Sequence, residues 1–142
     1  MSDEKLMELA LQAREGSYSP YSHFRVGAAL LCADDSVYTG CNIENAAFTP
    51  GICAERTAIY KAVSEGKRVF TAIAIAGGPE GSAPALTAPC GVCRQVMREF
   101  CDPEEFRIIL GAGTGEKQVY LLKELLPLSF GPGNLNGKEK HS

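Results

Sequence analysis

The sequence predicts an α/β fold, a three-layer α-β-α sandwich built on a mixed five-stranded sheet. Segments with helical periodicity alternate with short β-prone runs in the order α-β-β-α-β-α-β-β, and in the middle of the chain single buried strands alternate with helices. The 142 residues are 45% hydrophobic and 22% charged, which is ordinary for a globular domain with its own core. We therefore expect one sheet covered on both faces within a single domain at residues 1–130, followed by a mobile tail at residues 131–142.

The first helix is expected near the N-terminus, where apolar side chains recur at helical spacing at Leu6, Leu9, Ala10 and Ala13. Ser2 is a good N-cap and Gly16 a good stop signal. An antiparallel hairpin should follow, because the apolar run from Phe24 to Cys32 and the β-prone run from Val37 to Cys41 are separated by four turn-forming residues.

The second helix is expected from about Cys53 to Glu65, before Gly66. Its alanine stripe suits close packing, at Ala54, Ala58 and Ala62. The next apolar run, from Thr71 to Ala76, is bounded by Gly-Gly-Pro and predicts a buried central strand.

The third helix should begin near Pro89, because proline favours the first helical position, and it should end before Asp102. Two further strands are expected, from Arg107 to Leu110 and from Gln118 to Leu122. A short helical run from Lys123 to Leu126 completes the predicted domain.

The charge balance argues against several classes of protein. The formal net charge is −3, from 17 acidic and 14 basic side chains, so the clustered cations that normally bind a nucleic-acid backbone are not expected. The N-terminus is charged, and no apolar run approaches the roughly 18 residues that span a bilayer. We expect a cytoplasmic protein without a membrane or nucleic-acid partner, in which the six cysteines are thiols or metal ligands.

Cys90 and Cys93 form a Cys-x-x-Cys pair at the expected start of the third helix. The spacing alone is compatible with a redox pair, half of a structural zinc site or part of a catalytic metal site. A structural zinc site would need two further ligands, and the sequence has no second Cys-x-x-Cys, while His23 lies in a polar loop and His141 in the tail. Another cysteine is therefore the most plausible companion.

Cys53 shares the position of Cys90, because it also stands at the expected N-terminus of a helix just after a proline-containing loop. Three thiolates with one open position are typical of a catalytic zinc. The other cysteines are interpreted as small buried apolar residues, at Cys32, Cys41 and Cys101. Glu55, two residues after Cys53, has two interpretations: a charge that stabilises the helix N-terminus, or a general acid/base beside the metal.

These motifs resemble the zinc-dependent cytidine deaminase family. The signature is Cys53-Ala54-Glu55 followed by Pro89-Cys90-x-x-Cys93. The resemblance extends over nearly the whole chain, through residues 18–22, 24, 26–29, 40–46, 53–58, 89–95, 125–127 and 130. It implies a catalytic domain that converts cytidine and deoxycytidine to uridine and deoxyuridine with release of ammonia, a step of pyrimidine salvage.

The resemblance also implies roles for individual residues. One zinc per chain would be held by Cys53, Cys90 and Cys93 and would activate the water that attacks C4 of cytosine, while Glu55 transfers protons. The three thiolates would leave the metal core with a net negative charge, and Arg56 would offset it by hydrogen-bonding the ligand sulfurs. Arg94 receives no role.

The small-molecule nucleoside would contact residues that match the family pattern: Phe24 beside the pyrimidine, Asn42 and Glu44 at the ribose, the backbone N–H of Ala54, the C=O of Ala88, and Phe130 of a neighbouring subunit. Similar short-chain enzymes are homotetramers whose sites neighbours complete. Phe48 replaces a tyrosine that is common in the family, which puts one contact between subunits in doubt.

Three other functions remain open from the sequence. The chain could deaminate other aminopyrimidines, including those in polynucleotides, although the acidic charge and the Asn42-x-Glu44 pair argue against this. It could also be a non-catalytic zinc-binding module or a thiol redox protein, which would leave Glu55 without a role.

Overall fold

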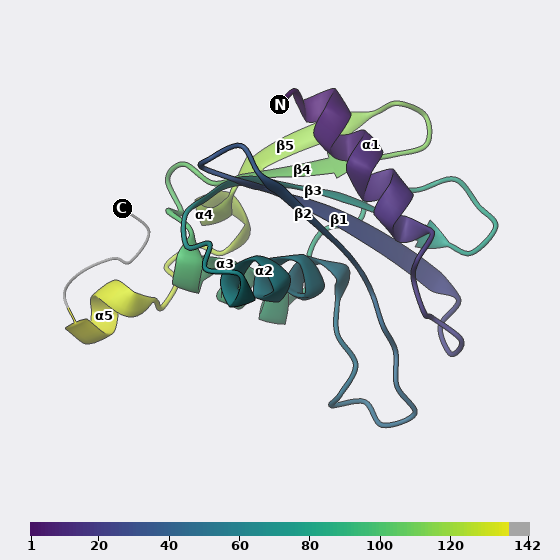
Figure 1. Cartoon of the computed structure of the whole chain (residues 1–142), viewed down its shortest axis with the longest axis horizontal. Coiled ribbons are helices and arrows are strands. Elements are labelled where there is room, and N and C mark those ends of the chain that lie inside the picture. The colour runs from purple at the N-terminus through teal and green to yellow at the C-terminus, as the bar shows by residue number, and fades with distance from the viewer. Residues whose placement is uncertain (137–142) are drawn as a thin grey trace.

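A five-stranded mixed sheet with helices on both faces forms the centre of the protein (Figure 1), as the computed structural model shows for residues 1–136. This confirms the predicted fold class. The last six residues of the expected tail, including His141, lie outside the described residues.

The strands run in the order β2-β1-β3-β4-β5 across the sheet. Their bounds are Phe24–Cys32 for β1, Val37–Cys41 for β2, Phe70–Pro79 for β3, Arg107–Gly111 for β4 and Lys117–Leu121 for β5. Neighbouring strands pair antiparallel except β3 and β4, which are parallel and are therefore joined by a helical crossover.

One face of the sheet is covered by α1 (Asp3–Arg14), which Ser2 caps by accepting a hydrogen bond from the Lys5 backbone N–H at 3.1 Å. Buried Leu6 and Ala10 of α1 pack against small side chains of the central strands, as Figure 1 shows for the helix as a whole. The approach is close at Gly27, where a Cβ would lie 2.0 Å from the Ala10 carbonyl oxygen. Only glycine allows β1 and α1 to meet in this way.

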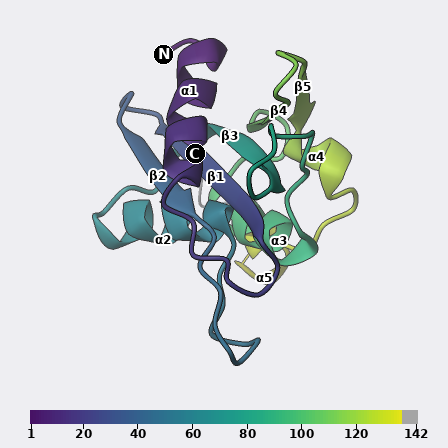
Figure 2. The same cartoon turned by 90° about the vertical axis from the view of Figure 1, so that its right-hand side faces the viewer.

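The other face is covered by α2 (Ala54–Ser64) and α3 (Gly91–Phe100), which lie over the larger core (Figures 1 and 2). This core joins buried side chains from both helices and the sheet, including Ile59, Met97, Ile73, Ile75 and Phe106. At Gly40 of β2 a Cβ would lie 2.6 Å from the Ala58 backbone nitrogen, so α2 rests almost directly on the strand backbone. The N-termini of α2 and α3 are thereby held on the same side of the molecule.

Two segments differ from the prediction. The strand β3 continues through Gly77 and Gly78 to Pro79, because β1 is long enough to pair with it as far as Phe24↔Pro79. The first residues of the expected mobile tail form a short helix, α5 (Pro132–Asn136), after α4 (Leu122–Leu125).

None of the helices in the described part of the chain has the length and apolar character needed to cross a bilayer. The loop between β2 and α2 extends away from the sheet in both views (Figures 1 and 2) and carries Phe48, whose side chain is 99% exposed.

Candidate metal centre and adjoining pocket

Three thiols converge at the N-termini of α2 and α3. The sulfur atoms of Cys53, Cys90 and Cys93 all lie within 4.8 Å of one another, and the Cys53 and Cys90 sulfurs are 3.5 Å apart. Three sulfur donors at this separation fit one zinc ion and leave a fourth position of its tetrahedral shell open to solvent or substrate. The fold thus brings the N-termini of α2 and α3 together around the three thiols.

The local backbone explains how the thiols reach this position. Cys53 and Cys90 are the N-cap residues of their helices, both with extended backbone angles. The Cys90 sulfur also accepts a hydrogen bond from the Cys93 backbone N–H at 3.4 Å. Both residues therefore stand at helix N-termini, where free N–H groups and the positive end of the helix dipole favour negative charge.

The pKa values of Cys53 and Cys93 are shifted in opposite directions. The Cys93 thiol donates a hydrogen bond to the Cys53 sulfur, which lowers the pKa of Cys53 to about 5, and the Arg56 guanidinium contributes in the same direction. The same partnership and burial raise the pKa of Cys93. Ionising all three thiols therefore calls for a bound cation.

Arg56 lies beside the sulfurs, as the family resemblance implied. Its Nη2 is 3.6 Å from the Cys53 sulfur. Its Nε is buried and has no hydrogen-bond partner among the described residues. The guanidinium thus lies with its positive charge close to the Cys53 sulfur.

Glu55 follows Cys53 in the first turn of α2 and is only 4% exposed. Burial raises the pKa of its carboxyl to about 7, although a backbone hydrogen bond opposes the shift. A solvated helix-capping glutamate would be exposed with an ordinary pKa. Its burial at the wall of the pocket favours the acid/base interpretation.

A pocket of about 630 Å³ opens beside the thiols. Eight of the sequence-predicted site residues line it: Asn42, Glu44, Cys53, Ala54, Glu55, Arg56, Ala88 and Cys90. The volume is within the range typical of small-molecule sites. A ligand in this pocket would lie against both the thiols and the Glu55 carboxylate.

Glu44, in the pocket wall, is anchored by hydrogen bonds from the loop after α1. Its Oε1 accepts hydrogen bonds from the backbone N–H groups of Tyr21 at 3.0 Å and Ser22 at 3.1 Å, and its Oε2 accepts from the Ser22 hydroxyl. The Ser22 hydroxyl lowers the pKa of the Glu44 carboxyl. The charged carboxylate is therefore oriented before a ligand binds.

Asn42 is used largely by the protein itself. Its Oδ1 accepts from the Val26 backbone N–H at 2.9 Å and from the Ser17 hydroxyl, and its Nδ2 donates to the Phe24 carbonyl at 2.8 Å. One N–H of the amide remains for a ligand. Asn42 thus joins the loop after α1 to strand β1 and also lines the pocket.

Three predicted site residues are not part of the pocket wall in the described chain: Cys93, which is buried, and Phe24 and Phe130, which are 37% and 58% exposed. The pocket also has wall residues that the sequence did not single out, among them Tyr21, Asn45 and Thr87. Tyr21 lies in a loop that the family resemblance covers, which was the available signal.

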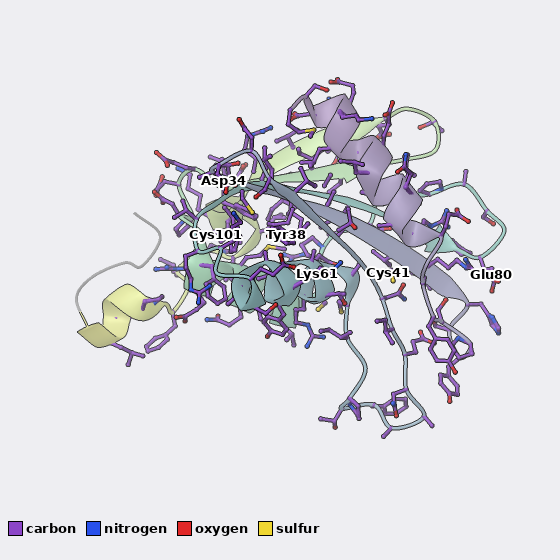
Figure 3. All side chains as sticks on the ribbon, viewed as in Figure 1. Asp34, Tyr38, Cys41, Lys61, Glu80 and Cys101 are labelled. Carbon is purple, nitrogen blue, oxygen red and sulfur yellow. The ribbon has the colours of Figure 1, made fainter. Side chains whose placement is uncertain are left out.

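The other cysteines occupy the places expected of apolar residues. Cys32 and Cys101 are buried, and Cys41 is half-buried. Cys41 ends strand β2 and Cys101 is the C-cap residue of α3; both are labelled in Figure 3. Burial raises the pKa of the Cys101 thiol, so it is neutral and unreactive.

Comparison with known families gives a match over residues 1–108 to the family described as the cytidine and deoxycytidylate deaminase zinc-binding region. The chain is 48% identical over 136 residues to a cytidine deaminase of Halalkalibacterium halodurans, covering 96% of this chain and 99% of the relative. It is 45% identical over 136 residues to a cytidine deaminase of Sporosarcina psychrophila, covering 96% of each.

Solved structures show the same likeness. The crystal structure of cytidine deaminase from Burkholderia pseudomallei superposes with a TM-score of 0.83 at 44% identity, covering 92% of this chain and all of that one. The crystal structure of cytidine deaminase from Mycobacterium tuberculosis gives a TM-score of 0.77 at 38% identity, covering 92% of this chain and 99% of that one. The thiol trio and the pocket therefore occur in a fold shared with these enzymes.

Proposed function

The chain belongs to the cytidine and deoxycytidylate deaminase family, and from this membership we propose that it hydrolyses cytidine and deoxycytidine to uridine and deoxyuridine with release of ammonia. It is a hydrolase acting on the C–N bond of a cyclic amidine, and zinc is its cofactor. The reaction would serve pyrimidine salvage. The observation that carries the proposal is the buried carboxylate of Glu55 beside three converging thiols in one pocket.

The zinc ligands in this proposal are the sulfurs of Cys53, Cys90 and Cys93. When bound, zinc would supply Lewis-acid activation of water at neutral pH. The Arg56 guanidinium, 3.6 Å from the Cys53 sulfur, would offset the charge of the thiolates.

Glu55 would move the protons. As a carboxylate it takes a proton from the attacking water, and as an acid it delivers that proton to ring N3. It then carries the remaining hydroxyl proton to the amino group, which leaves as ammonia while the C4 carbonyl forms. One side chain can act in both directions because burial raises the pKa of the Glu55 carboxyl to about 7, where it can both accept and donate a proton near neutral pH.

Backbone groups would hold the base. The N–H of Ala54 belongs to the first turn of α2, where backbone donors have no partner within the helix. The carbonyl of Ala88 belongs to the loop before α3 and would accept from the departing amino group. Because these contacts come from the backbone, they do not depend on which side chain stands at either position, and alanine is compatible with both.

The ribose would be recognised at the other end of the pocket. The pre-oriented Glu44 carboxylate would accept from a sugar hydroxyl, and the remaining N–H of Asn42 would donate to one. A free base would leave both groups without their ligand partners. This arrangement supports a nucleoside substrate over free cytosine, with Phe24 near the pyrimidine.

We further propose a cytoplasmic homotetramer with a single catalytic domain at residues 1–130 and with Phe130 placed over the base in a neighbouring subunit. The exposed Phe48 and Phe130 side chains and the absence of Phe130 from the described wall of its own pocket support this assembly. Its test is the molar mass of the purified protein in solution, where a monomer would contradict it.

The ultraviolet absorbance change of cytidine tests the activity directly. The protein should release uridine and ammonia and contain about one zinc per chain, and a zinc chelator should abolish turnover until zinc is restored. Parallel assays with free cytosine and a cytosine-containing oligonucleotide should show much lower rates. Disulfide reductase activity without deamination would overturn the proposal in favour of thiol redox chemistry.

A further inference from the structure

The segment between α4 and α5, residues 126–131, displays two large apolar side chains to solvent. Leu128 is 106% exposed and has a φ of 51°, in the left-handed region that a leucine rarely adopts, and Phe130 is 58% exposed. Such backbone strain costs on the order of 1–3 kcal/mol and persists only where the surroundings enforce it. Other contacts must therefore hold this segment in place. The Leu128 and Phe130 side chains do not do so, because they are exposed to solvent.

Side chains of α3 hold the segment instead. Arg94 Nη1 donates to the Leu125 carbonyl at 2.7 Å, and Gln95 Nε2 donates to the Phe130 carbonyl at 2.9 Å. Between them, Arg98 Nε donates to the Ser129 hydroxyl at 2.8 Å. Hydrogen bonds to backbone and hydroxyl groups fix the course of the chain whatever apolar side chains it carries.

The fit at the end of the segment is equally close. A Cβ on Gly131 would lie 2.4 Å from the Arg98 guanidinium carbon, so the chain passes directly against that side chain before α5 begins. Together these contacts hold both ends of the segment against one helix face. We call the three side chains, Arg94, Gln95 and Arg98, the α3 clamp.

Arg94 also contacts the loop that leads into the thiol of Cys90, residues 88–90, which we call the metal loop. Its Nε donates to the Pro89 carbonyl at 2.8 Å, and Pro89 lies between Ala88 of the pocket wall and the thiol of Cys90. One partly buried guanidinium thus bridges two carbonyls, one beside the thiols and one at the start of the displayed segment. A planar fork is suited to such a bridge, whereas a single ammonium is not.

We propose that Arg94 and Gln95 are positioning residues of the reaction: Gln95 fixes the Phe130 ring for a neighbouring subunit's pocket, and Arg94 ties that segment to the metal loop of its own chain. This assignment rests on the proposed function and assembly. Neither residue lines the pocket in the described chain, so each would act through the backbone that it holds. Fixing the ring in advance reduces the ordering cost of covering the base.

Gln95→Met is the sharpest test of the first half, because it keeps the length of the side chain and removes its donor. Loss of one such bond should raise KM for cytidine about three- to tenfold, with kcat, zinc content and molar mass unchanged. Gln12→Met makes the same chemical change at an exposed position of α1 on the other face of the sheet and should change neither constant. An unchanged KM for Gln95→Met would overturn this half.

Arg94→Lys tests the bridge. Because lysine keeps the charge and loses the fork, it should lower kcat about tenfold and speed zinc loss to a chelator, as expected for a residue that orients a ligand loop. Wild-type kcat and zinc retention in this variant would overturn the second half.

Mixed assemblies test whether the ring acts on a neighbour. When Gln95→Met chains are co-assembled with Glu55→Gln chains, active pockets belong to the first chain and some receive Phe130 from the second, whose clamp is intact. A population of sites with wild-type KM should appear. A uniformly raised KM would show that the ring acts within its own chain.

The clamp can be judged without any activity. Amide hydrogen exchange in residues 126–131 should be faster in Gln95→Met than in Gln12→Met, whatever the substrate proves to be. Equal exchange would reject the clamp, whereas an inactive wild-type protein with normal clamp protection would reject only the proposed function.

Discussion

The N-termini of α2 and α3 begin alike and do different work. Each helix starts at a cysteine N-cap with extended backbone angles, and each carries an arginine within about one turn. Arg56 on α2 directs its guanidinium at the Cys53 sulfur, whereas Arg94 on α3 donates to two carbonyls. Arginine thus places positive charge beside a sulfur in α2, whereas in α3 its planar guanidinium bridges two backbone carbonyls.

Burial separates the two ends as well. The first turn of α2 is enclosed, with Ala54 0% and Glu55 4% exposed, whereas Val92 in the first turn of α3 is 57% exposed. We therefore assign proton transfer to the enclosed N-terminus of α2. The exposed N-terminus of α3 is assigned the role of holding the metal loop and residues 126–131 in place. Four experiments can break or sharpen this contrast.

Glu55→Gln should have the largest effect. Removing the proton carrier is expected to lower kcat about 10³-fold or more while the protein keeps its zinc, because the amide cannot exchange protons. The matched control is Glu65→Gln at the exposed far end of α2, where activity should be unchanged. A Glu55→Gln variant with substantial turnover would remove α2 from the proton chemistry.

Cys90→Ser and Cys53→Ser should come next. Each removes one sulfur donor, so zinc affinity should fall by more than the roughly 10–100-fold that follows loss of a residue behind the ligands. Because serine is itself a good N-cap, the unfolding free energy of the metal-free protein should change by less than about 1 kcal/mol in either variant. Zinc titration and thermal unfolding measure the two quantities, and a variant that still binds zinc tightly would show that its sulfur is not a ligand.

Arg56→Gln and Arg56→Lys test whether the positive charge or the planar guanidinium of Arg56 matters on α2. Loss of the charge beside sulfur in Arg56→Gln should lower zinc affinity or kcat about 10–100-fold. Arg56→Lys keeps the charge and should retain more of both, whereas Arg94→Lys on α3 should behave like a loss of the side chain. If lysine serves equally well at both positions, the contrast between the two arginines fails.

The smallest effects should come from two glycines. Gly40→Ala would drive a methyl group into the α2 backbone, where a Cβ lies 2.6 Å from the Ala58 nitrogen, and should cost about 1–3 kcal/mol of stability. Gly91→Ala in α3 meets nothing within 4 Å and should be neutral or stabilise by up to about 1 kcal/mol. Chemical denaturation of both variants measures the difference, and equal losses would mean that α2 is no more tightly seated than α3.

Much of the fold could be predicted because its signals are local. The bounds of β1 and β2 follow from an apolar run, a turn and a β-prone run, and they agree with the structure. The end of β3 could not be predicted, because Gly77-Gly78-Pro79 has the composition of a turn and becomes strand only through pairing with β1. The helix α5 was missed because its composition favours a loop and its neighbour Gly131 is held by a distant arginine.

The site divides in the same way. Cys53, Glu55, Cys90 and Cys93 could be selected from spacing, helix starts and the family resemblance, and the fold brings the three thiols together. Their roles, and those of the substrate-binding residues, remain predictions for the experiments above. Arg94 received no role from the sequence because its partner Leu125 lies 31 residues away, a distance that no local pattern spans.

The three thiols also differ in their access to solvent: Cys90 is exposed, Cys53 is half-buried and Cys93 is buried. A metal ion that enters the finished fold from solvent would therefore meet Cys90 first and Cys93 last. A carrier can hand an ion to the outermost sulfur of the finished fold and let it move inward by stepwise ligand exchange, without opening the core. The same exposed sulfur sets the vulnerability of the centre, since scavengers and oxidants would first meet the protein at Cys90.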